Sequence, residues 1–259
     1  MKDSLSVKYF NVSGRGVSVR CKMIFDEIVP GGRVILCGTG FGGHKDGRAF
    51  ERFARRVLKK NRDVAIVVFD WPCHGDDVKK KMSLEDCGLY LDLVLDWARK
   101  RFRTDDSRLY GYAVSFGGYF FLHYFSQRGC PFVRTVLRCP ALPMHETLNH
   151  SVLRPEDREG LAAGRTVQVG FDRKVPVDAR FLTELQSNDV TRRDYTAFSD
   201  RLMILHGTKD EIVPMENTAS FARDQGIPFL PVENADHRFT DPDRMEYAIE
   251  EIIRFFGMN

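Results

Sequence analysis

The chain has 259 residues, of which 43% are hydrophobic and 29% charged, so disordered, collagen-like and coiled-coil proteins are excluded. Lys and Arg number 39 against 36 Asp and Glu, and the formal net charge of +3 indicates no particular partner. The basic clusters at residues 79–81 and 99–101 lack the interleaved aromatic residues of a nucleic-acid surface, so we interpret them as solvated. We therefore expect no nucleic-acid partner.

The cysteines and the N-terminus indicate the cellular compartment of the protein. The six cysteines include no C-x-x-C pair, and Cys37 ends the apolar run from Val34, where a reduced thiol packs as a small hydrophobe. Residues 1–8 are charged and lack the apolar stretch of a signal peptide. No window reaches the roughly 18 apolar residues of a membrane span. These features predict a cytoplasmic protein without a membrane partner, and they leave the oligomeric state open, a homodimer included.

The first two predicted elements form a hairpin. Val7 to Val12 and Val17 to Phe25 are rich in β-branched and aromatic residues, and the turn residues Ser13 to Gly16 separate them. Strands and helices then alternate along the chain. Strands are predicted at 33–37, 64–69, 108–113, 132–139, 201–206 and 228–233, and helices at about 48–60, 116–127 and 216–225.

Two further helices have clear apolar faces. Ser83 can cap a helix in which Cys87, Leu91, Val94, Leu95 and Ala98 recur on one face. The C-terminal helix carries Met245, Ala248, Ile249, Ile252, Ile253 and Phe256 at helical spacing. Since parallel strands need crossovers that are usually helices, the alternation predicts an α/β fold with a mostly parallel sheet of about eight strands covered on both faces.

One stretch breaks the alternation. Residues 141–200 show no clear strand-helix unit and contain several prolines with scattered hydrophobes, namely Phe171, Phe181, Leu182, Leu185, Tyr195 and Phe198. We interpret this stretch as an insertion that forms a lid over the sheet. The predicted organisation is therefore a single domain, 1–259, with a core of residues 1–140 and 201–259.

A glycine motif near the front resembles a dinucleotide fingerprint. Gly38 to Gly43 match G-x-G-x-x-G after a predicted strand. A hairpin comes first, however, and Asp70 follows Gly43 by 27 positions, whereas the fingerprint expects its acid about 20 positions on. Residues 44–47 also separate the glycines from the helix. We therefore expect no nucleotide cofactor.

The strongest chemical signal is Ser115. An apolar strand, Leu109 to Ala113, runs through Val114 into this serine and then into a helix. A serine on a tight strand-to-helix turn needs small residues two before and two after it, because strand and helix pass close together. Ala113 and Gly117 satisfy that requirement in an A-x-S-x-G variant of the usual G-x-S-x-G. The alternative is an ordinary turn in which Ser115 only caps the helix.

A serine hydroxyl needs a base and an orienting carboxylate to become a nucleophile. Asp210 follows the predicted strand that ends at His206, and His237 follows the last predicted strand. Both lie where parallel strands end, at the edge that holds the sites of open α/β sheets. We therefore assign Ser115 as nucleophile, His237 as base and Asp210 as acid.

The remaining candidates are weaker. Asp236, next to His237, is interpreted as stabilising its loop, and Glu146 is a substitute acid. His206 ends a strand, where its ring is expected to pack in the core. The other histidines lie inside a helix, in the insertion or in loops near the front, and each is expected to be structural: His44, His74, His123, His145 and His150.

The order of these motifs resembles the α/β-hydrolase-fold serine hydrolases over nearly the whole chain. The four matched segments are Thr39 to Gly43, Ala113 to Gly118, His206 to Asp210 and Ala235 to Phe239. Asp70 to Gly75 is similar to the family's D-x-x-G-H-G turn, with Cys73 in place of glycine, and Thr39 stands where histidine is common.

The resemblance implies an oxyanion hole built from the main-chain N–H groups of Phe41 and Phe116. It implies hydrolysis of a carboxylic ester through an acyl-enzyme intermediate, without metal or cofactor. The elbow, the insertion length and the D-H-R-F ending are most similar to the carboxylesterase and cinnamoyl or feruloyl esterase group, so the expected substrate is a small, partly polar ester, esters of aromatic acids included. An amidase or peptidase, a thioesterase, an acyltransferase and a non-catalytic binding protein on the same fold remain alternatives.

Overall fold

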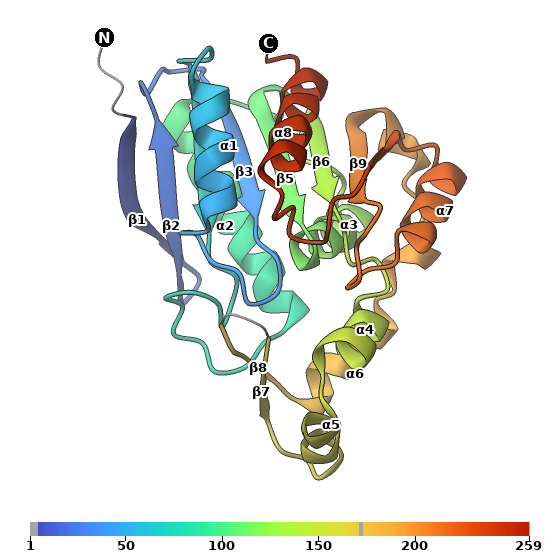
Figure 1. Cartoon of the computed structure of the whole chain (residues 1–259). Helices are drawn as coiled ribbons and strands as arrows, with labels where there is room; N and C mark the ends of the chain where they lie inside the picture. The colour runs from blue at the N-terminus through green and yellow to red at the C-terminus, as the bar shows by residue number, and fades with distance from the viewer. Residues whose placement is uncertain (1–4, 171–172, 259) are drawn as a thin grey trace.

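The computed structural model describes residues 5–170 and 173–258, which form an eight-stranded sheet with helices on both faces (Figure 1). The strand order is β1-β2-β4-β3-β5-β6-β9-β10. The hairpin strands β1 and β2 are antiparallel, β2 runs antiparallel to β4, and the remaining neighbours are parallel. The strands are β1 Ser6–Gly14, β2 Val17–Phe25, β3 Arg33–Gly38, β4 Val64–Phe69, β5 Leu109–Val114, β6 Arg134–Arg138, β9 Leu202–Gly207 and β10 Phe229–Val232. The predicted α/β fold is confirmed.

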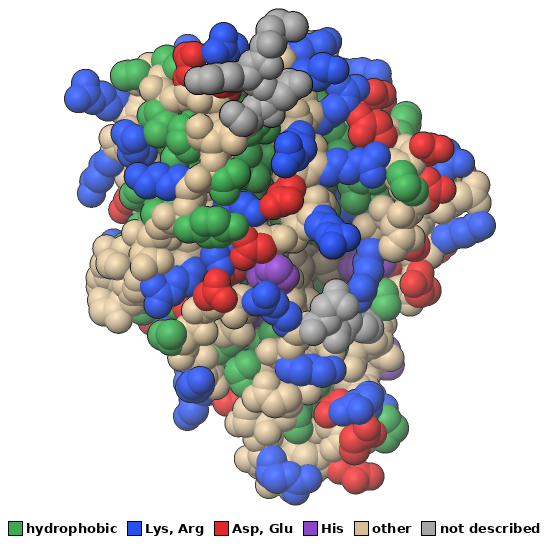
Figure 2. Space-filling model, turned by 60° about the vertical axis from the view of Figure 1, so that its left-hand side comes forward, with side chains coloured by type: hydrophobic (Ala, Val, Ile, Leu, Met, Phe, Trp, Pro, Cys, Tyr) green, Lys and Arg blue, Asp and Glu red, His purple; other side chains and the backbone are tan. Residues whose placement is uncertain are grey.

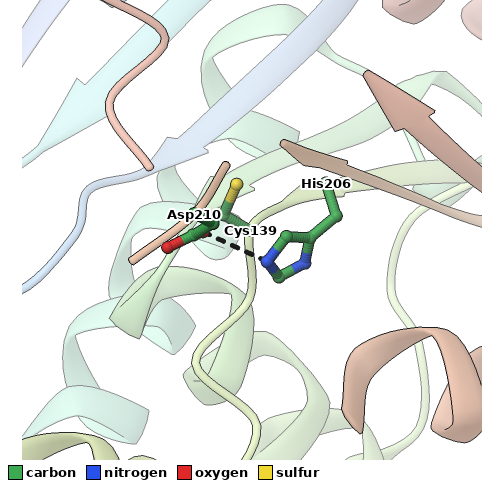
Figure 3. Close-up of side chains that lie close together, drawn as sticks. All are labelled: Cys139, His206 and Asp210. Atoms are coloured by element: carbon green, nitrogen blue, oxygen red, sulfur yellow. Dashed lines mark ion pairs between the residues drawn. The ribbon is translucent and has the colours of Figure 1, made fainter. Parts of the chain in front are cut away.

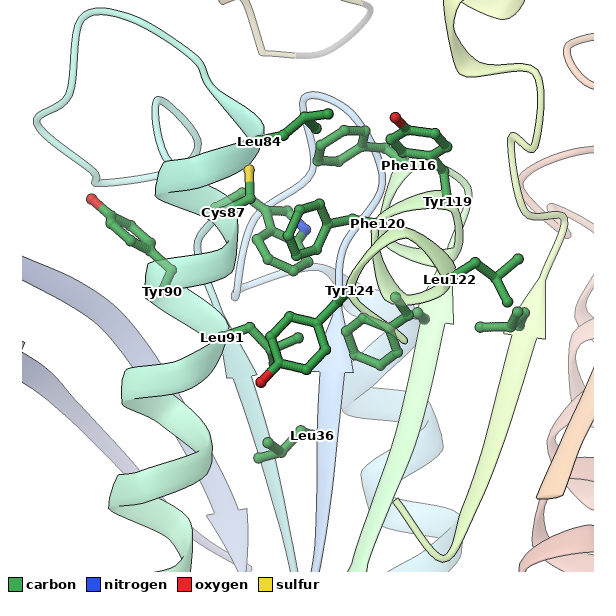
Figure 4. Close-up of a cluster of buried hydrophobic side chains, with 14 of the residues drawn as sticks. Leu36, Leu84, Cys87, Tyr90, Leu91, Phe116, Tyr119, Phe120, Leu122 and Tyr124 are labelled. Carbon is green, nitrogen blue, oxygen red and sulfur yellow. The ribbon is translucent and has the colours of Figure 1, made fainter. Parts of the chain in front are cut away.

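Each face of the sheet has its own apolar core. Helices α1 (Arg48–Leu58) and α8 (Pro242–Phe256) lie on one face, and α2 (Leu84–Phe102) and α3 (Phe116–Arg128) lie on the other (Figure 1). Helix α7 (Met215–Gln225) contributes to the same cluster as α2 and α3. Figure 4 shows aromatic and aliphatic side chains of α2 and α3 packed together above the strands. Central strands such as β4 are buried along their whole length because helices cover both of their faces.

Helix α2 begins where its sequence predicts, after Ser83. The side chain of Ser83 accepts a hydrogen bond from the main-chain N–H of Asp86, which satisfies one of the free amides of the first turn. Basic residues 99–101 occupy the last turn, where they interact favourably with the negative end of the helix dipole. The positive φ of +50° at Arg103 ends the helix.

The insertion, residues 141–200, is more regular than the sequence indicates. It contains α4 (Met144–Thr147), a π-turn (Leu148–Val152), α5 (Pro155–Ala162), strands β7 (Val167–Val169) and β8 (Val175–Val177), α6 (Ala179–Ser187) and two 3-10 turns (Val190–Arg192 and Thr196–Arg201). The prediction of a segment without strand-helix units is therefore wrong. Three-residue strands and one- or two-turn helices are too short to produce a measurable period.

The insertion lies at the edge where the parallel strands end (Figure 1). Its buried side chains Phe181, Leu185 and Tyr195 join the core cluster of α2 and α3, whereas Phe171 lies outside the described residues. This position brings the insertion to the rim that holds the predicted site residues.

Charged side chains of both signs are spread over the face shown in Figure 2, with Lys and Arg on the sheet region and on the insertion. Among the described residues, no helix is long and apolar enough to cross a membrane.

We predict that Ser83→Ala lowers the free energy of unfolding by about 1 kcal/mol, because the Asp86 amide loses its cap. Urea denaturation measures the change. Ser83→Asp restores an acceptor and should recover most of the loss; equal destabilisation by both variants would show that the loss does not come from the missing acceptor.

Candidate active site

Ser115 occupies a strained turn between β5 and α3. Its φ of +53° and ψ of −116° are conformations that non-glycine residues adopt only when the surroundings impose them. The Ser115 N–H donates to the carbonyl of Arg138 at 3.0 Å, and its carbonyl accepts from the amides of Tyr119 and Ala141 at 3.1 and 3.2 Å. These bonds fix the backbone and leave the hydroxyl at the rim of the sheet.

The predicted need for small neighbours has a direct structural cause. A Cβ added at Gly117 would lie 2.6 Å from the Gly38 carbonyl oxygen and 2.8 Å from that of Thr39. Ala113 pairs with Gly38 across strands β5 and β3, and a Cβ at Gly38 would meet the Ala113 Cβ at 3.4 Å. The alanine of the A-x-S-x-G variant therefore fits because glycine occupies the opposite strand.

His237 connects Ser115 to Asp210. Its Nε2 lies 3.0 Å from Ser115 Oγ, and its Nδ1 lies 2.7 Å from Asp210 Oδ2. Since a carboxylate can only accept, Nδ1 carries the hydrogen and Nε2 is left to accept from the serine hydroxyl. The structure thus brings the three predicted side chains into one hydrogen-bond chain, Ser115–His237–Asp210, formed by loops that follow β5, β9 and β10.

The loop that carries His237 is held by its neighbour. Asp236 accepts hydrogen bonds from the main-chain N–H of Thr240 at 2.9 Å and from its hydroxyl. Asn234 and Phe239, on either side of the loop, have positive φ angles of +61° and +55°. Asp236 therefore stabilises the loop, as the sequence suggests.

Asp210 is an ionised, fully buried carboxylate. Its Oδ1 accepts from the amides of Ile212 and Val213 at 3.0 and 2.8 Å, and His206 Nε2 lies 3.1 Å from its Oδ2. Burial alone would raise the pKa of Asp210, but hydrogen bonds from His206, His237 and the Val213 amide outweigh it and hold that pKa well below its usual value. The carboxylate can therefore orient His237 and stabilise a positive charge on it.

Cys139 lies close to Asp210 and His206 (Figure 3). Within the described ranges, Cys139, His206 and Asp210 place potential metal-ligand atoms within 4.8 Å of one another. Burial raises the pKa of the Cys139 thiol well above its usual value. The His206 Nε2 hydrogen already points at the Val213 carbonyl, 3.0 Å away. The cluster is therefore better suited to holding the Asp210 carboxylate than to binding a metal ion.

The loop after β3 passes beside Ser115. A Cβ added at Gly40 would lie 3.3 Å from the Ser115 Cβ, and the Gly43 N–H closes the loop on the Gly40 carbonyl at 2.9 Å. Across residues 5–170 and 173–258, no recorded hydrogen bond uses the main-chain N–H of Phe41 or of Phe116. The rings of Phe41 and Phe116 meet edge to face at 6.0 Å. The amides predicted for an oxyanion hole thus come from segments that touch each other next to the serine.

His74, which the sequence analysis expects to be structural, packs against both of these aromatic residues. Its ring stacks on Phe116 at 6.1 Å and meets Phe41 edge to face at 5.6 Å. Burial lowers the pKa of His74 to about 4, so the ring is neutral at neutral pH. Its Nδ1 lies 2.8 Å from the Pro72 carbonyl. The similarity of residues 70–75 to the D-x-x-G-H-G turn is the signal that could have pointed to this residue.

Asp70 anchors the glycine loop rather than a nucleotide. This buried carboxylate accepts from the main-chain N–H groups of Lys45 and Asp76 at 2.7 and 3.0 Å, and Lys45 Nζ lies 3.2 Å away. With these partners it has little capacity for a ribose hydroxyl. The glycines instead bring the loop close to Ser115.

The other candidate residues lie elsewhere. Glu146 lines a cavity of about 330 Å³ between the insertion and α7, together with Asp189 and Asp224, and the hydrogen-bond chain does not line it. His123 is in α3, stacked on Tyr119 at 6.3 Å. His206 is buried as expected, but its contact with Asp210 was not anticipated.

A sequence model described as the alpha/beta hydrolase family matches residues 34–250. The chain belongs to this family. A comparison with curated proteins finds no significant match.

Several solved structures share the hydrolase fold of this chain. Est1E from Butyrivibrio proteoclasticus, solved with bound ferulic acid, is 19% identical with a TM-score of 0.73, covering 95% of this chain and 97% of its own. Esterase Pf2001 of Pyrococcus furiosus is 14% identical with a TM-score of 0.71, covering 99% and 95%. Mouse alpha/beta hydrolase domain-containing protein 10 is 17% identical with a TM-score of 0.69, covering 98% of each chain. At these identities the likeness shows the fold.

We predict that Gly117→Ala destabilises this hydrolase-family chain by about 1–3 kcal/mol, because the new methyl group collides with the main chain of Gly38 and Thr39. Gly88→Ala in α2 is the matched control. Its added Cβ meets only an Arg128 side-chain nitrogen at 3.7 Å, so we expect no loss or a gain of about 0.5–1 kcal/mol. Denaturant midpoints compare the two; a stable Gly117→Ala variant would contradict the role of this contact.

Proposed function

We propose that the protein is a serine hydrolase that cleaves carboxylic esters of small, aromatic acids through an acyl-enzyme intermediate. The observation that carries the proposal is the hydrogen-bond chain from Ser115 Oγ through His237 to Asp210, with distances of 3.0 and 2.7 Å. The chain unites a nucleophile, a base and an orienting acid at one rim of the sheet. Membership of the alpha/beta hydrolase family supports it.

In the proposed reaction, Ser115 Oγ attacks the ester carbonyl carbon while its proton passes to His237 Nε2. Asp210 stabilises the resulting imidazolium and keeps its Nδ1–H directed at the carboxylate. His237 then gives the proton to the leaving alcohol oxygen as the carbon–oxygen bond breaks. Water attacks the acyl-enzyme with His237 again as base, which releases the acid and restores Ser115.

The negative oxygen of the tetrahedral intermediate would be held by the N–H groups of Phe41 and Phe116. The Phe116 amide lies at the N-terminus of α3, where the helix dipole favours negative charge. One such donor is worth about 3 kcal/mol in kcat in serine hydrolases. Ser115, with its strained φ of +53°, directly precedes this amide.

Two observations favour an aromatic acyl group. Phe41, in the loop beside Ser115, is a partly exposed aromatic residue whose ring packs on the buried rings of Phe116 and His74. The protein Est1E, whose fold this chain shares, has been solved with ferulic acid, an aromatic acid. We propose that the insertion forms the lid over this site, with basic residues such as Arg173 and Arg180 that suit a partly polar substrate better than a lipid surface.

A substrate panel separates ester hydrolysis from the other reactions of the fold. p-Nitrophenyl esters of increasing chain length, aryl acrylate esters, thioesters and aminoacyl anilides are compared by kcat/KM. The proposal requires the highest value for a short or aryl acrylate ester. Preference for a thioester or an anilide would reassign the activity without removing the serine mechanism.

We predict that a fluorophosphonate probe labels the protein on Ser115 and that Ser115→Ala abolishes the labelling. Only an activated serine hydroxyl reacts with such a probe. Ser126→Ala is the matched control, because this serine lies in α3 and donates to the His123 carbonyl rather than to a base. Peptide mapping by mass spectrometry identifies the site; absence of labelling in folded protein would favour a non-catalytic binding role.

We predict that His237→Ala and Asp210→Asn remain folded but lower kcat by about 10³- to 10⁴-fold, because the serine loses its base or the base loses its correct tautomer. Steady-state kinetics with circular dichroism checks both statements. Asp236→Asn removes the neighbouring carboxylate, which contacts Thr240 instead, and should lower kcat less than about 10-fold. Near-normal kcat/KM in Asp210→Asn would show that another residue is the acid.

A further inference from the structure

His206 is a buried imidazole in contact with the acid of the proposed site. It lies near the end of β9, is fully buried, and places Nε2 3.0 Å from the Val213 carbonyl oxygen and 3.1 Å from Asp210 Oδ2 (Figure 3). A carbonyl can only accept, so Nε2 carries the hydrogen. That N–H donates to the Val213 carbonyl, and Asp210 Oδ2 lies beside the same nitrogen at ion-pair distance.

The oxygen that His206 approaches is the one that binds His237. Asp210 Oδ2 accepts from His237 Nδ1 at 2.7 Å, while Oδ1 accepts from the amides of Ile212 and Val213. The two amides fix the position of the carboxylate. Oδ2 therefore interacts with two imidazoles at once. How strongly it attracts one of them depends on its contact with the other.

Packing alone does not account for an imidazole here. Nδ1 of His206 is buried without a hydrogen-bond partner among the described residues, which costs free energy that an apolar side chain of the same size would avoid. The ring contact with Phe229, at 6.5 Å, would be kept by phenylalanine. What phenylalanine would lack is the donor that faces Asp210.

We propose that His206 is a positioning residue that shares Asp210 Oδ2 with His237 and so limits how strongly the carboxylate attracts the His237 Nδ1–H. This inference rests on the proposed function of the Ser115–His237–Asp210 chain. A carboxylate oxygen with two donors is a weaker acceptor for each of them than an oxygen with one. Loss of His206 strengthens the Asp210–His237 bond and makes His237 harder to deprotonate.

Other ionisable groups of the described residues lie near this pair. Cys139, at the end of β6, is a buried thiol beside Asp210, and Arg138 lies next to it with its guanidinium over the Phe239 ring at 4.8 Å. Asp236 and Arg238 flank His237 in the sequence. These groups are unchanged in the variants below, so a shift in pH dependence reports on His206.

The test compares His206→Phe, which removes the donor, with His206→Gln, whose side-chain amide can donate from a similar position. Proton NMR of histidine-labelled protein follows the His237 Nδ1–H, which is assigned by its loss in His237→Ala. We expect this resonance to move downfield in His206→Phe and to stay near the wild-type position in His206→Gln. In the pH profile of kcat/KM, the acid limb should move up by about one pH unit in His206→Phe, with KM unchanged.

His123→Phe is the matched control for the loss of a buried imidazole, because its recorded ring contacts are with Tyr119 and Phe120 in α3. It should move neither the resonance nor the acid limb. An unchanged or upfield resonance in folded His206→Phe overturns the inference, whether or not the protein turns over esters. A downfield shift in a protein that neither reacts with fluorophosphonate nor cleaves any ester supports the shared contact and overturns the proposed function instead.

Discussion

The close contact between Gly117 and the main chain at Gly38 and Thr39 is the constraint on which the site depends. A Cβ at Gly117 would come within 2.6 Å of a carbonyl oxygen, so α3 can start beside β3 only without a side chain there. This approach puts the first amide of α3 next to the loop that carries Phe41. Ser115, directly before this helix, has a positive φ, and its hydroxyl lies 3.0 Å from His237 Nε2. Backbone packing thus determines the geometry before any charged group is involved.

Two buried carboxylates at different strand ends are held in the same way, by hydrogen bonds from main-chain amides. Asp70 follows β4 and Asp210 follows the turn after β9, and each accepts two main-chain amides. Their other partners differ. Asp70 faces the ammonium of Lys45, and burial raises its pKa against the effect of those bonds, whereas imidazoles hold the pKa of Asp210 low. Asp70 therefore fixes the loop, while Asp210 faces a group that can exchange a proton with Ser115.

The sequence predicted the sheet and the three residues of the hydrogen-bond chain because both depend on local signals. Strand ends and turns place Ser115, Asp210 and His237 at one rim once the sheet is parallel. The contact of His206 with Asp210 could not be predicted. The position of His206 in an apolar strand indicates that its ring is buried, but it does not indicate where Nε2 points. Likewise the short helices and strands of residues 141–200 depend on packing against α2 and α3, which leaves no period in their own sequence.

Cys73 shows why a departure from a glycine motif need not change the site. It stands where the resembled turn has glycine and adopts a φ of +65°, a conformation that costs about 1–2 kcal/mol for a residue with a side chain. Asp77 offsets that cost by accepting the Cys73 amide at 2.9 Å and the Lys79 amide at 2.8 Å, and it is itself held by the Tyr90 hydroxyl at 2.6 Å. Hydrogen bonds from other parts of the chain therefore hold Cys73 in the backbone conformation that a glycine would adopt without them. The next residue, His74, reaches the rings of Phe41 and Phe116 because this turn is kept.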